Sequence, residues 1–263
     1  MRRATDPTTL VGIGVALGAL LVTMLLEGSS PLALFLLPPL LLVFGGTFGA
    51  AVAGSTIDDL RRLRQWTQLA LTPERVPTMT ERIEVLVDLA GKARREGLLA
   101  LDRQLGAVRD PFLRRGLRLA VDGTDPDRLR SSLEGEIAAR RTEEKVAAKF
   151  FARMAGYAPT IGIIGTVIGL IHVLADLGDT AALGPLVATA FVATLWGVLS
   201  ANFLWLPMSQ RIMRTSDLRT AQLELLLTGI AEIQAGSSPR AMRQRLTALL
   251  PPDEAAAARA AAA

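Results

Sequence analysis

Two hydroxyl side chains lie within the longest apolar stretches of the sequence and are the candidate polar groups of an ion path. Thr166 belongs to the apolar run 154–175 and Thr194 to the run 183–206, and a short polar turn joins the two runs. Each run has about the 20 residues that a helix needs to cross ~30 Å of hydrocarbon. A threonine hydroxyl there can line a path for a hard cation, or it can bond a carbonyl one turn back in its own helix. The sequence leaves both interpretations open.

Small residues accompany the two threonines at helical spacing. Pro159, Gly162, Thr166 and Gly169 follow one another at intervals of three, four and three residues, and a similar stripe runs from residue 190 to residue 201. Such stripes let helix backbones approach closely inside a bilayer. The residues that we expect to pack these helices are Gly162, Gly165, Gly169, Ala190, Gly197 and Ala201. We predict that this hairpin forms the wall of an ion path shared with another protein.

No Asp, Glu, Lys or Arg occurs within the apolar runs of this chain. Proton relays and ion pumps usually keep ionisable residues at that depth, because such residues are costly there and are retained for function. The chain therefore cannot carry an ion on a carboxylate of its own. If it conducts, a partner helix must supply the charge.

Pro159 and Pro207 lie where a polar helix is expected to run into an apolar one. A proline inside a helix removes one backbone donor and frees the carbonyl four residues earlier. The result is either a static kink that only affects packing or a hinge that passes movement from the membrane to the polar segments. The residues alone do not separate these two possibilities.

Composition and charge placement describe a membrane protein with a large polar part. Half of the 263 residues are apolar, the mean hydropathy is positive, and there is no cysteine and a single histidine, which excludes disulfides and most metal sites. Lys and Arg flank the apolar runs and are missing from the two short connections at 27–31 and 176–182. This distribution predicts cytoplasmic N- and C-termini and gives no reason to expect a nucleic-acid partner.

The predicted fold is an all-α membrane protein with four transmembrane helices in two hairpins and a helical cytoplasmic insert between them. Pro38 and Pro39 should kink or break the second of these spans. The predicted segments are an N-terminal hairpin at 1–54 (spans 10–26 and 31–54), an insert at 55–153, a second hairpin at 154–207 (spans 154–175 and 183–206), and C-terminal cytoplasmic helices with a tail at 208–263.

A charged run in the insert is usually just a solvated helix face. If 82–108 formed one helix, Arg95 and Asp102 would project together opposite its apolar stripe, with Arg94 on the flank, although Gly97 weakens that continuity. No nucleotide loop, catalytic triad, metal spacing or carboxylate pair occurs in the sequence, so we do not expect an enzyme.

Short motifs along nearly the whole chain resemble the MotA/PomA family of flagellar motor stator proteins, within the wider MotA/TolQ/ExbB proton-channel group. The individual motifs are weak, but their order along the chain makes the combination specific. The matching stretches lie at 45–49, 92–102, 110–116, 121–125, 157–170, 201–207 and 236–239.

The resemblance implies binding partners and a cellular location. Five copies would surround two copies of a single-span partner like MotB, which would supply the missing membrane aspartate. The complex would lie in the bacterial inner membrane, in contact with lipid, and its insert would push on the rotor protein FliG. The rotor-contacting charged pair matches Arg94 and Asp102, with Arg95 able to share the role; the family usually has glutamate at the second position.

The resemblance also bears on the ion and on the hinges. Pro159 and Pro207 match the two prolines of the family, which favours the hinge and coupling interpretation. Thr166 and Thr194 match positions where a hydroxyl pair accompanies sodium-driven members, which favours Na⁺ over H⁺. No cofactor is expected, and a transient Na⁺ near the two hydroxyls is the one metal contact that we expect.

Two rival functions remain. The first is a TolQ/ExbB-like transducer of the proton-motive force, a group with three spans and an outward N-terminus, whereas Arg2 and Arg3 and the paired hairpins favour four spans and an inward N-terminus. The second is a non-conducting membrane scaffold. It predicts no ion flux and does not explain why Thr166 and Thr194 lie within the stripes of small residues.

Overall fold

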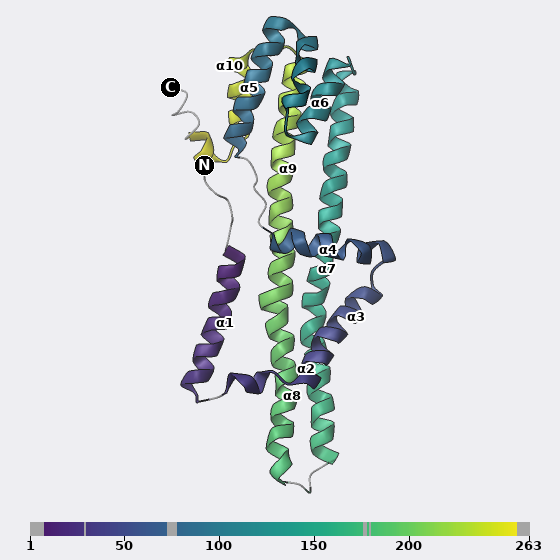
Figure 1. Cartoon of the computed structure of the whole chain (residues 1–263), viewed down its shortest axis with the longest axis vertical. Helices are drawn as coiled ribbons and strands as arrows, with labels where there is room; N and C mark the ends of the chain where they lie inside the picture. Colours follow the sequence, from purple (N-terminus) through teal and green to yellow (C-terminus); the bar gives the residue numbers. More distant parts are fainter. Residues whose placement is uncertain (1–7, 29, 73–77, 176–177, 179, 257–263) are drawn as a thin grey trace. The chain divides into compact units, whose positions relative to one another are not determined.

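The computed structural model describes residues 8–28, 30–72, 78–175, 178 and 180–256 (Figure 1). Within these residues every regular element is helical and there is no strand. The chain forms two compact units. Unit 1 comprises Met1–Glu74 and Glu144–Arg214, and unit 2 comprises Arg75–Glu143 and Thr215–Ala263. The boundaries fall inside the long helices α7 (Pro126–Ala175) and α9 (Leu206–Gln234), so both helices contribute to both units.

Unit 1 contains the apolar helices. Two stretches of helix, Pro126–Ala175 and Leu183–Gln234, are long and apolar enough to cross a membrane, and Val11–Leu26 and Leu37–Ala53 are shorter apolar helices. Large apolar side chains on these helices remain exposed, with Ile163 at 56% and Leu174 at 66% of their full accessibility. A soluble protein would bury side chains of this kind, so their exposure favours a lipid or protein environment around unit 1.

The segment expected as a single second span is broken at its prolines. A 3₁₀ turn, η1 (Pro31–Leu34), precedes the short helix α2 (Leu37–Leu40), in which Pro38 takes one of the first helical positions, where a missing N–H costs least. The chain then passes through a π-helical segment, η2 (Leu41–Gly45), into α3 (Gly46–Ala53). The break that the proline pair predicts is therefore present.

The helix α4 (Ile57–Leu71) follows the apolar helices and belongs to unit 1. Its start is fixed by a capping box, in which the Thr56 amide donates to the Asp59 carboxylate over 3.0 Å and the Asp59 amide donates to the Thr56 hydroxyl over 3.2 Å. Its buried face carries Trp66, whose ring lies 5.8 Å from that of Phe150 on α7. Buried residues of α4, α7 and α9 form a hydrophobic cluster in unit 1: Trp66, Ala70, Ala147, Phe150, Phe151, Met154, Met208 and Ile212.

Unit 2 is a helical bundle built by α5 (Met79–Glu96), the 3₁₀ segment η3 (Leu98–Ala107), α6 (Pro111–Val121), α10 (Pro239–Thr247) and parts of α7 and α9. Its core contains the fully buried side chains Leu86, Leu101, Phe112, Leu117, Leu129, Leu133, Leu225 and Ile230. Gly116 of α6 lies directly against the side chains of Ile230 and Leu133. A larger residue at Gly116 would require the side chains of Ile230 and Leu133 to shift.

Candidate functional site

Thr166 and Thr194 face each other across the seam between α7 and α8 (Thr180–Ser200), which Figure 1 shows as neighbouring helices. Their hydroxyl oxygens are in direct hydrogen-bond contact. The Thr166 hydroxyl also lies 3.2 Å from the carbonyl oxygens of Gly162 and Ala190, and the Thr194 hydroxyl lies 3.2 Å from that of Gly162. Four neutral oxygens from two helices therefore meet at one place in an otherwise apolar seam.

The two threonines differ in what they bond. Thr166 contacts the carbonyl one turn back in its own helix, as membrane threonines commonly do. Thr194 contacts Thr166 and Gly162, both on the opposite helix. The pair thus ties α7 to α8, and its oxygens point into the hairpin rather than along a single helix surface. Spacing alone places the two threonines on stripes but does not show that the stripes face each other.

Glycines make this close approach of α7 and α8 possible. A Cβ on Gly162 would lie 2.9 Å from the carbonyl oxygen of Ala193, and a Cβ on Gly169 would lie 2.9 Å from the Cα of Ala190. A Cβ on Gly165 would meet the Ala193 side chain at 2.6 Å. Real Cβ atoms do not tolerate such distances to backbone, so only glycine fits. Ala201 is also buried, at the start of the segment that follows α8.

The two candidate hinge prolines are accommodated in different ways. Pro159 lies inside the continuous helix α7. Pro207 is the second residue of α9 and follows a π-helical segment, η4 (Ala201–Trp205), whose widened turn is closed by a bond from the Leu206 amide to the Ala201 carbonyl. Such π-segments are common at functional sites and at kinks. The widened turn before Pro207 shifts the hydrogen-bond pattern of the helix. The helix can therefore continue although Pro207 has no N–H to donate.

Trp196 is a positioning residue that the sequence did not single out for this role. Its indole N–H donates to the carbonyl oxygen of Leu34 over 2.7 Å, and its ring packs against Phe35 and Phe44 at centroid distances of 5.7 and 5.9 Å. The Leu34 carbonyl belongs to the irregular segment before α2, where regular helical bonds end. Trp196 therefore connects α8 to the broken second apolar segment, two residues away from Thr194.

The charged residues of the insert occupy two elements instead of one. Arg94 and Arg95 lie in the last turn of α5, which ends at Glu96, and Gly97 then adopts a φ of +85° that strongly favours glycine. Asp102 lies beyond this break, in η3. The assumption of one helix over 82–108 is therefore wrong. Arg94, Arg95 and Asp102 are all exposed, and they form no ion pair with one another in the described part of the chain.

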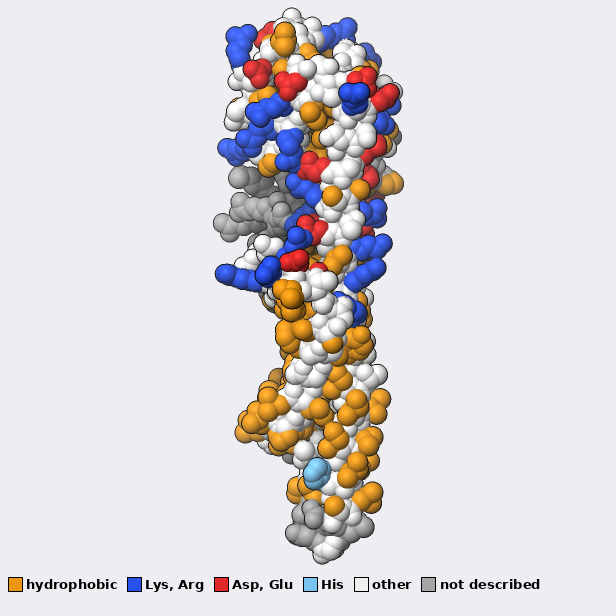
Figure 2. Space-filling view, turned by 90° about the vertical axis from the view of Figure 1, so that its right-hand side faces the viewer, with side chains coloured by type: hydrophobic (Ala, Val, Ile, Leu, Met, Phe, Trp, Pro, Cys, Tyr) orange, Lys and Arg blue, Asp and Glu red, His pale blue; other side chains and the backbone are white. Residues whose placement is uncertain are grey.

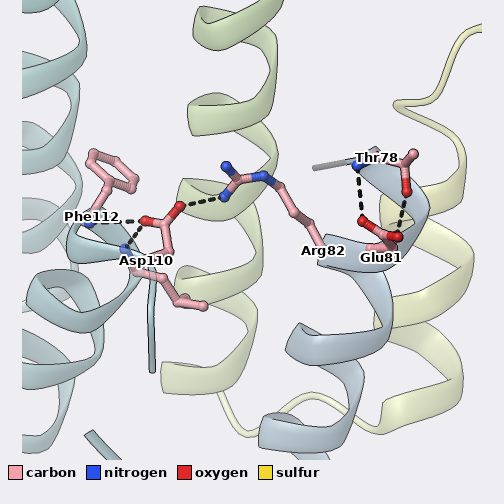
Figure 3. A network of polar contacts seen from close by, with 6 residues as sticks. Thr78, Glu81, Arg82, Asp110 and Phe112 are labelled. Carbon is pink, nitrogen blue, oxygen red and sulfur yellow. Dashed lines mark hydrogen bonds and ion pairs between the residues drawn. The ribbon is translucent and has the colours of Figure 1, made fainter. Parts of the chain in front are cut away.

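A half-buried ion pair joins the start of α5 to the start of α6 (Figure 3). One oxygen of Asp110 caps α6 by accepting from the amides of Phe112 and Leu113 at 2.9 and 3.0 Å, and the other accepts from Arg82 of α5 at 2.6 Å. Burial alone raises the pKa of the Asp110 carboxyl, but the Leu113 amide and the Arg82 guanidinium outweigh burial, so the pKa is lowered. The carboxylate is thus held charged, and it joins α5 to α6.

The surface of unit 1 separates polar from apolar side chains. Figure 2 shows orange apolar side chains over the lower part of the molecule, with the single histidine among them, and blue and red charged side chains only above this apolar part. His172 bonds the Ile168 carbonyl in its own helix at 3.0 Å. Among the described residues, no group of three His, Cys, Asp or Glu could hold a metal ion. The fold and the exposed apolar helices are those of a helical membrane protein, with an uncharged seam that holds four polar oxygens.

Known proteins share both the sequence and the fold. Residues 104–225 match the MotA/TolQ/ExbB proton channel family. Motility protein A of Bacillus subtilis (strain 168) is 34% identical over 94% of this chain and 91% of its own. The structure of the flagellar MotAB stator complex from Bacillus subtilis matches with a TM-score of 0.88 and 33% identity, over 94% of this chain and 97% of that chain.

A second solved structure agrees with the first. The structure of C. jejuni MotAB matches with a TM-score of 0.90 and 26% identity, over 95% of this chain and 97% of that chain. Sequence and fold similarity both extend over nearly the whole length. The chain belongs to the MotA/TolQ/ExbB proton channel family, alongside its motility protein A members.

Proposed function

We infer that this protein is the ion-conducting stator subunit of a bacterial flagellar motor, in which the flow of H⁺ or Na⁺ drives torque on the rotor. The observation that carries this function is the four-oxygen cluster at Thr166 and Thr194, set in a hairpin without a charged side chain. An uncharged seam can pass a cation only if another chain supplies the titrating group. The solved relatives, which are MotAB complexes, are consistent with such a partner.

The proposed assembly has five copies of this chain around two copies of a MotB-like single-span subunit that carries a membrane aspartate. In each copy we propose four spans in the inner membrane, with both termini in the cytoplasm. The two long apolar helices support two of these spans, and the shorter apolar helices 11–26 and 37–53 supply the others. The absence of Lys and Arg from the two short connections, 27–31 and 176–182, supports the cytoplasmic termini.

Movement is proposed to pass from the seam to the insert through Pro159 and Pro207. Gly197 lies against Pro159, and η4 precedes Pro207, so both prolines are next to the helix pair that holds the hydroxyls. The exposed Arg94, Arg95 and Asp102 would then make the charged contact with FliG. Exposed charges of this kind steer and register a contact more than they add affinity.

The same geometry supports Na⁺ as the coupling ion. Two hydroxyl and two carbonyl oxygens are ligands of the type that hard cations prefer, whereas a proton requires only a partner carboxylate. Thr166→Ala removes one of the four oxygens. The sodium concentration needed for half-maximal swimming should rise about two- to tenfold, the equivalent of one hydrogen bond.

Thr160→Ala is the matched control for this experiment. The Thr160 hydroxyl is exposed on the same helix and bonds only the Tyr157 carbonyl at 2.8 Å, so its loss should leave the sodium response unchanged. If the swimming speed of the unmodified strain does not depend on sodium concentration, Na⁺ is excluded as the coupling ion, but the proposed stator function is not affected.

The stator function itself is tested by reconstitution. The chain is produced with a MotB-like single-span protein from the same organism, and ion flux into proteoliposomes is measured for the complex and for this chain alone. The complex should form and conduct, and the chain alone should not. Failure of the two proteins to assemble, or full conduction by this chain without its partner, would contradict the proposed function.

A further inference from the structure

An open groove of about 460 Å³ lies on α7 just before its apolar part begins. It is lined by Val146, Lys149, Ala152 and Arg153, all of which belong to unit 1. Val146 is 39% exposed, so the groove offers apolar as well as basic surface. The proposed torque mechanism does not use this groove.

The basic residues of the groove continue along one face of α7. Lys145, Lys149 and Arg153 follow one another at intervals of four residues, which places them on one side of the helix. Like charges at this interval repel and destabilise a helix. A row of three breaks a local rule of helix design, and such violations in natural proteins point to a function.

The charges in this row have little compensation within the protein. Lys145 and Lys149 are exposed and have no carboxylate partner in the described part of the chain. The Arg153 guanidinium donates to the Gly54 carbonyl and, over 2.9 Å, to the Ser55 hydroxyl, which are neutral acceptors. These bonds hold Arg153 in position without neutralising it.

The segments around the groove are also basic. Residues 55–72, 144–153 and 206–214 together contain eight Lys and Arg against three Asp and Glu. Of these acids, Asp59 is electrostatically coupled to Arg153, but its carboxylate is engaged by Thr56 in the capping box of α4. The positive charge is therefore a property of this end of unit 1, as the blue side chains in Figure 2 show.

The membrane placement proposed above puts the groove at the depth where a bilayer presents phosphate. The apolar run 154–175 starts immediately after Arg153, contains no charged residue, and leaves Ile163 and Ile164 more than half exposed. A run of this length matches the ~30 Å hydrocarbon core, which places Arg153 and Lys149 among the headgroups. The bilayer itself supplies a high local concentration of anionic lipid phosphates at that depth.

We propose that this groove binds the phosphate of an anionic phospholipid, with Lys149 and Arg153 holding the phosphate and Lys145 extending the contact. Ion pairing with phosphate removes the repulsion along the row. The proposal requires the membrane placement of unit 1, but it does not require that the protein conducts ions. Lipid binding therefore stands or falls separately from the stator function.

The test is native mass spectrometry of the full-length protein in detergent, titrated with phosphatidylglycerol or with phosphatidylcholine. Each basic residue near a membrane surface contributes about 1 kcal/mol, so Lys149→Gln should weaken phosphatidylglycerol binding about fivefold. Lys149→Arg should bind like the unmodified protein. Phosphatidylcholine binding should be weak and equal in all variants.

Arg130→Gln is the matched control, because Arg130 is an exposed basic residue on the same helix, in unit 2. It removes the same charge and should leave lipid binding unchanged. Equal weakening by Lys149→Gln and Arg130→Gln would overturn the proposal, since only net charge would then matter. Displacement of the lipid by millimolar glycerol phosphate would also overturn it, in favour of a soluble ligand. If Lys149→Gln binds lipid normally but no longer gives the mass of the assembled oligomer, the proposal would be overturned, because the groove would then be a contact between copies of the chain.

Discussion

Gly197 of α8 lies against Pro159 of α7, so that a Cβ on Gly197 would be 3.2 Å from the Cα of Pro159 and 2.6 Å from the carbonyl oxygen of Ala158. The candidate hinge is thus packed directly on the helix that carries Thr194, without an intervening side chain. Any bending of α7 at Pro159 must change this backbone contact. If Pro159 is the proposed hinge, its bending would therefore act directly on the seam.

Gly197→Ala should separate the two helices at this point. The added methyl group meets backbone, which cannot rotate away, and overpacking of this kind typically costs about 1–3 kcal/mol. We expect a lower thermal midpoint of the detergent-solubilised protein and slower swimming. Gly184→Ala on the same helix is the control, because a Cβ there has no neighbour within 4 Å. Equal behaviour of the two variants would show that the close contact is unimportant.

Thr194→Val should weaken both the seam and ion passage. Valine keeps the shape of threonine but leaves Thr166 and the Gly162 carbonyl without one partner, at a cost of about 1 kcal/mol for the lost hydrogen bond. Ion flux of the reconstituted complex should fall, and Thr194→Ser should restore much of it. Thr189→Val removes a hydroxyl that bonds only the Pro185 carbonyl of its own helix and should have no such effect.

Asp110→Asn should destabilise unit 2 while preserving the cap of α6. Asparagine is a good helix N-cap, so the main loss is the charge that pairs with Arg82. The side chains of Arg82 and Asp110 are only 14% and 25% exposed, so the arginine would remain buried without a counter-charge. We expect a loss of about 2–3 kcal/mol, somewhat below the range for fully buried pairs. Chemical unfolding monitored by circular dichroism measures this loss, and an unchanged midpoint would contradict it.

The same pair predicts a response to acid. The pKa of Asp110 in the folded protein is lower than its ordinary value of 3.8. The stability from the pair is therefore fully present above that value and is lost as the pH falls through the folded pKa. The thermal midpoint of the unmodified protein should therefore keep its full difference from that of Asp110→Asn above pH 3.8 and drop towards it as the pH falls from 3.8 through the folded pKa. A constant difference between the two proteins over this range would rule out the linkage.

Much of the fold follows from local sequence, but the key contacts of the site do not. The apolar runs predict the helices, and the glycine spacing predicts which helix faces carry small residues. Pro38 and Pro39 predict the break before α2. That Thr166 meets Thr194 depends on the angle between two helices, which a stripe does not determine. The bond from Trp196 to Leu34 joins residues 162 positions apart, and no local pattern indicates it.

Gly97 shows the opposite case, in which a local signal decides the structure. Its positive φ ends α5 and turns the chain into η3, so that the two arginines and Asp102 lie on separate elements. A glycine within a helical pattern is a weak breaker on average, because tertiary packing often overrides it. Here the buried side chains of Leu101 and Leu105 hold the segment after the break against the core of unit 2.

The hydroxyls of Thr166 and Thr194 can each donate one hydrogen bond, and more than one acceptor oxygen lies within reach of each. Thr166 can donate to the Thr194 oxygen while Thr194 donates to the Gly162 carbonyl, or Thr194 can donate to Thr166 while Thr166 donates to the Ala190 carbonyl. Both arrangements contain the same number of bonds but opposite dipoles. The seam can therefore reverse its polarity by two hydroxyl rotations. In the proposed ion path, a passing charge would meet a lining that reorients without any movement of the helices.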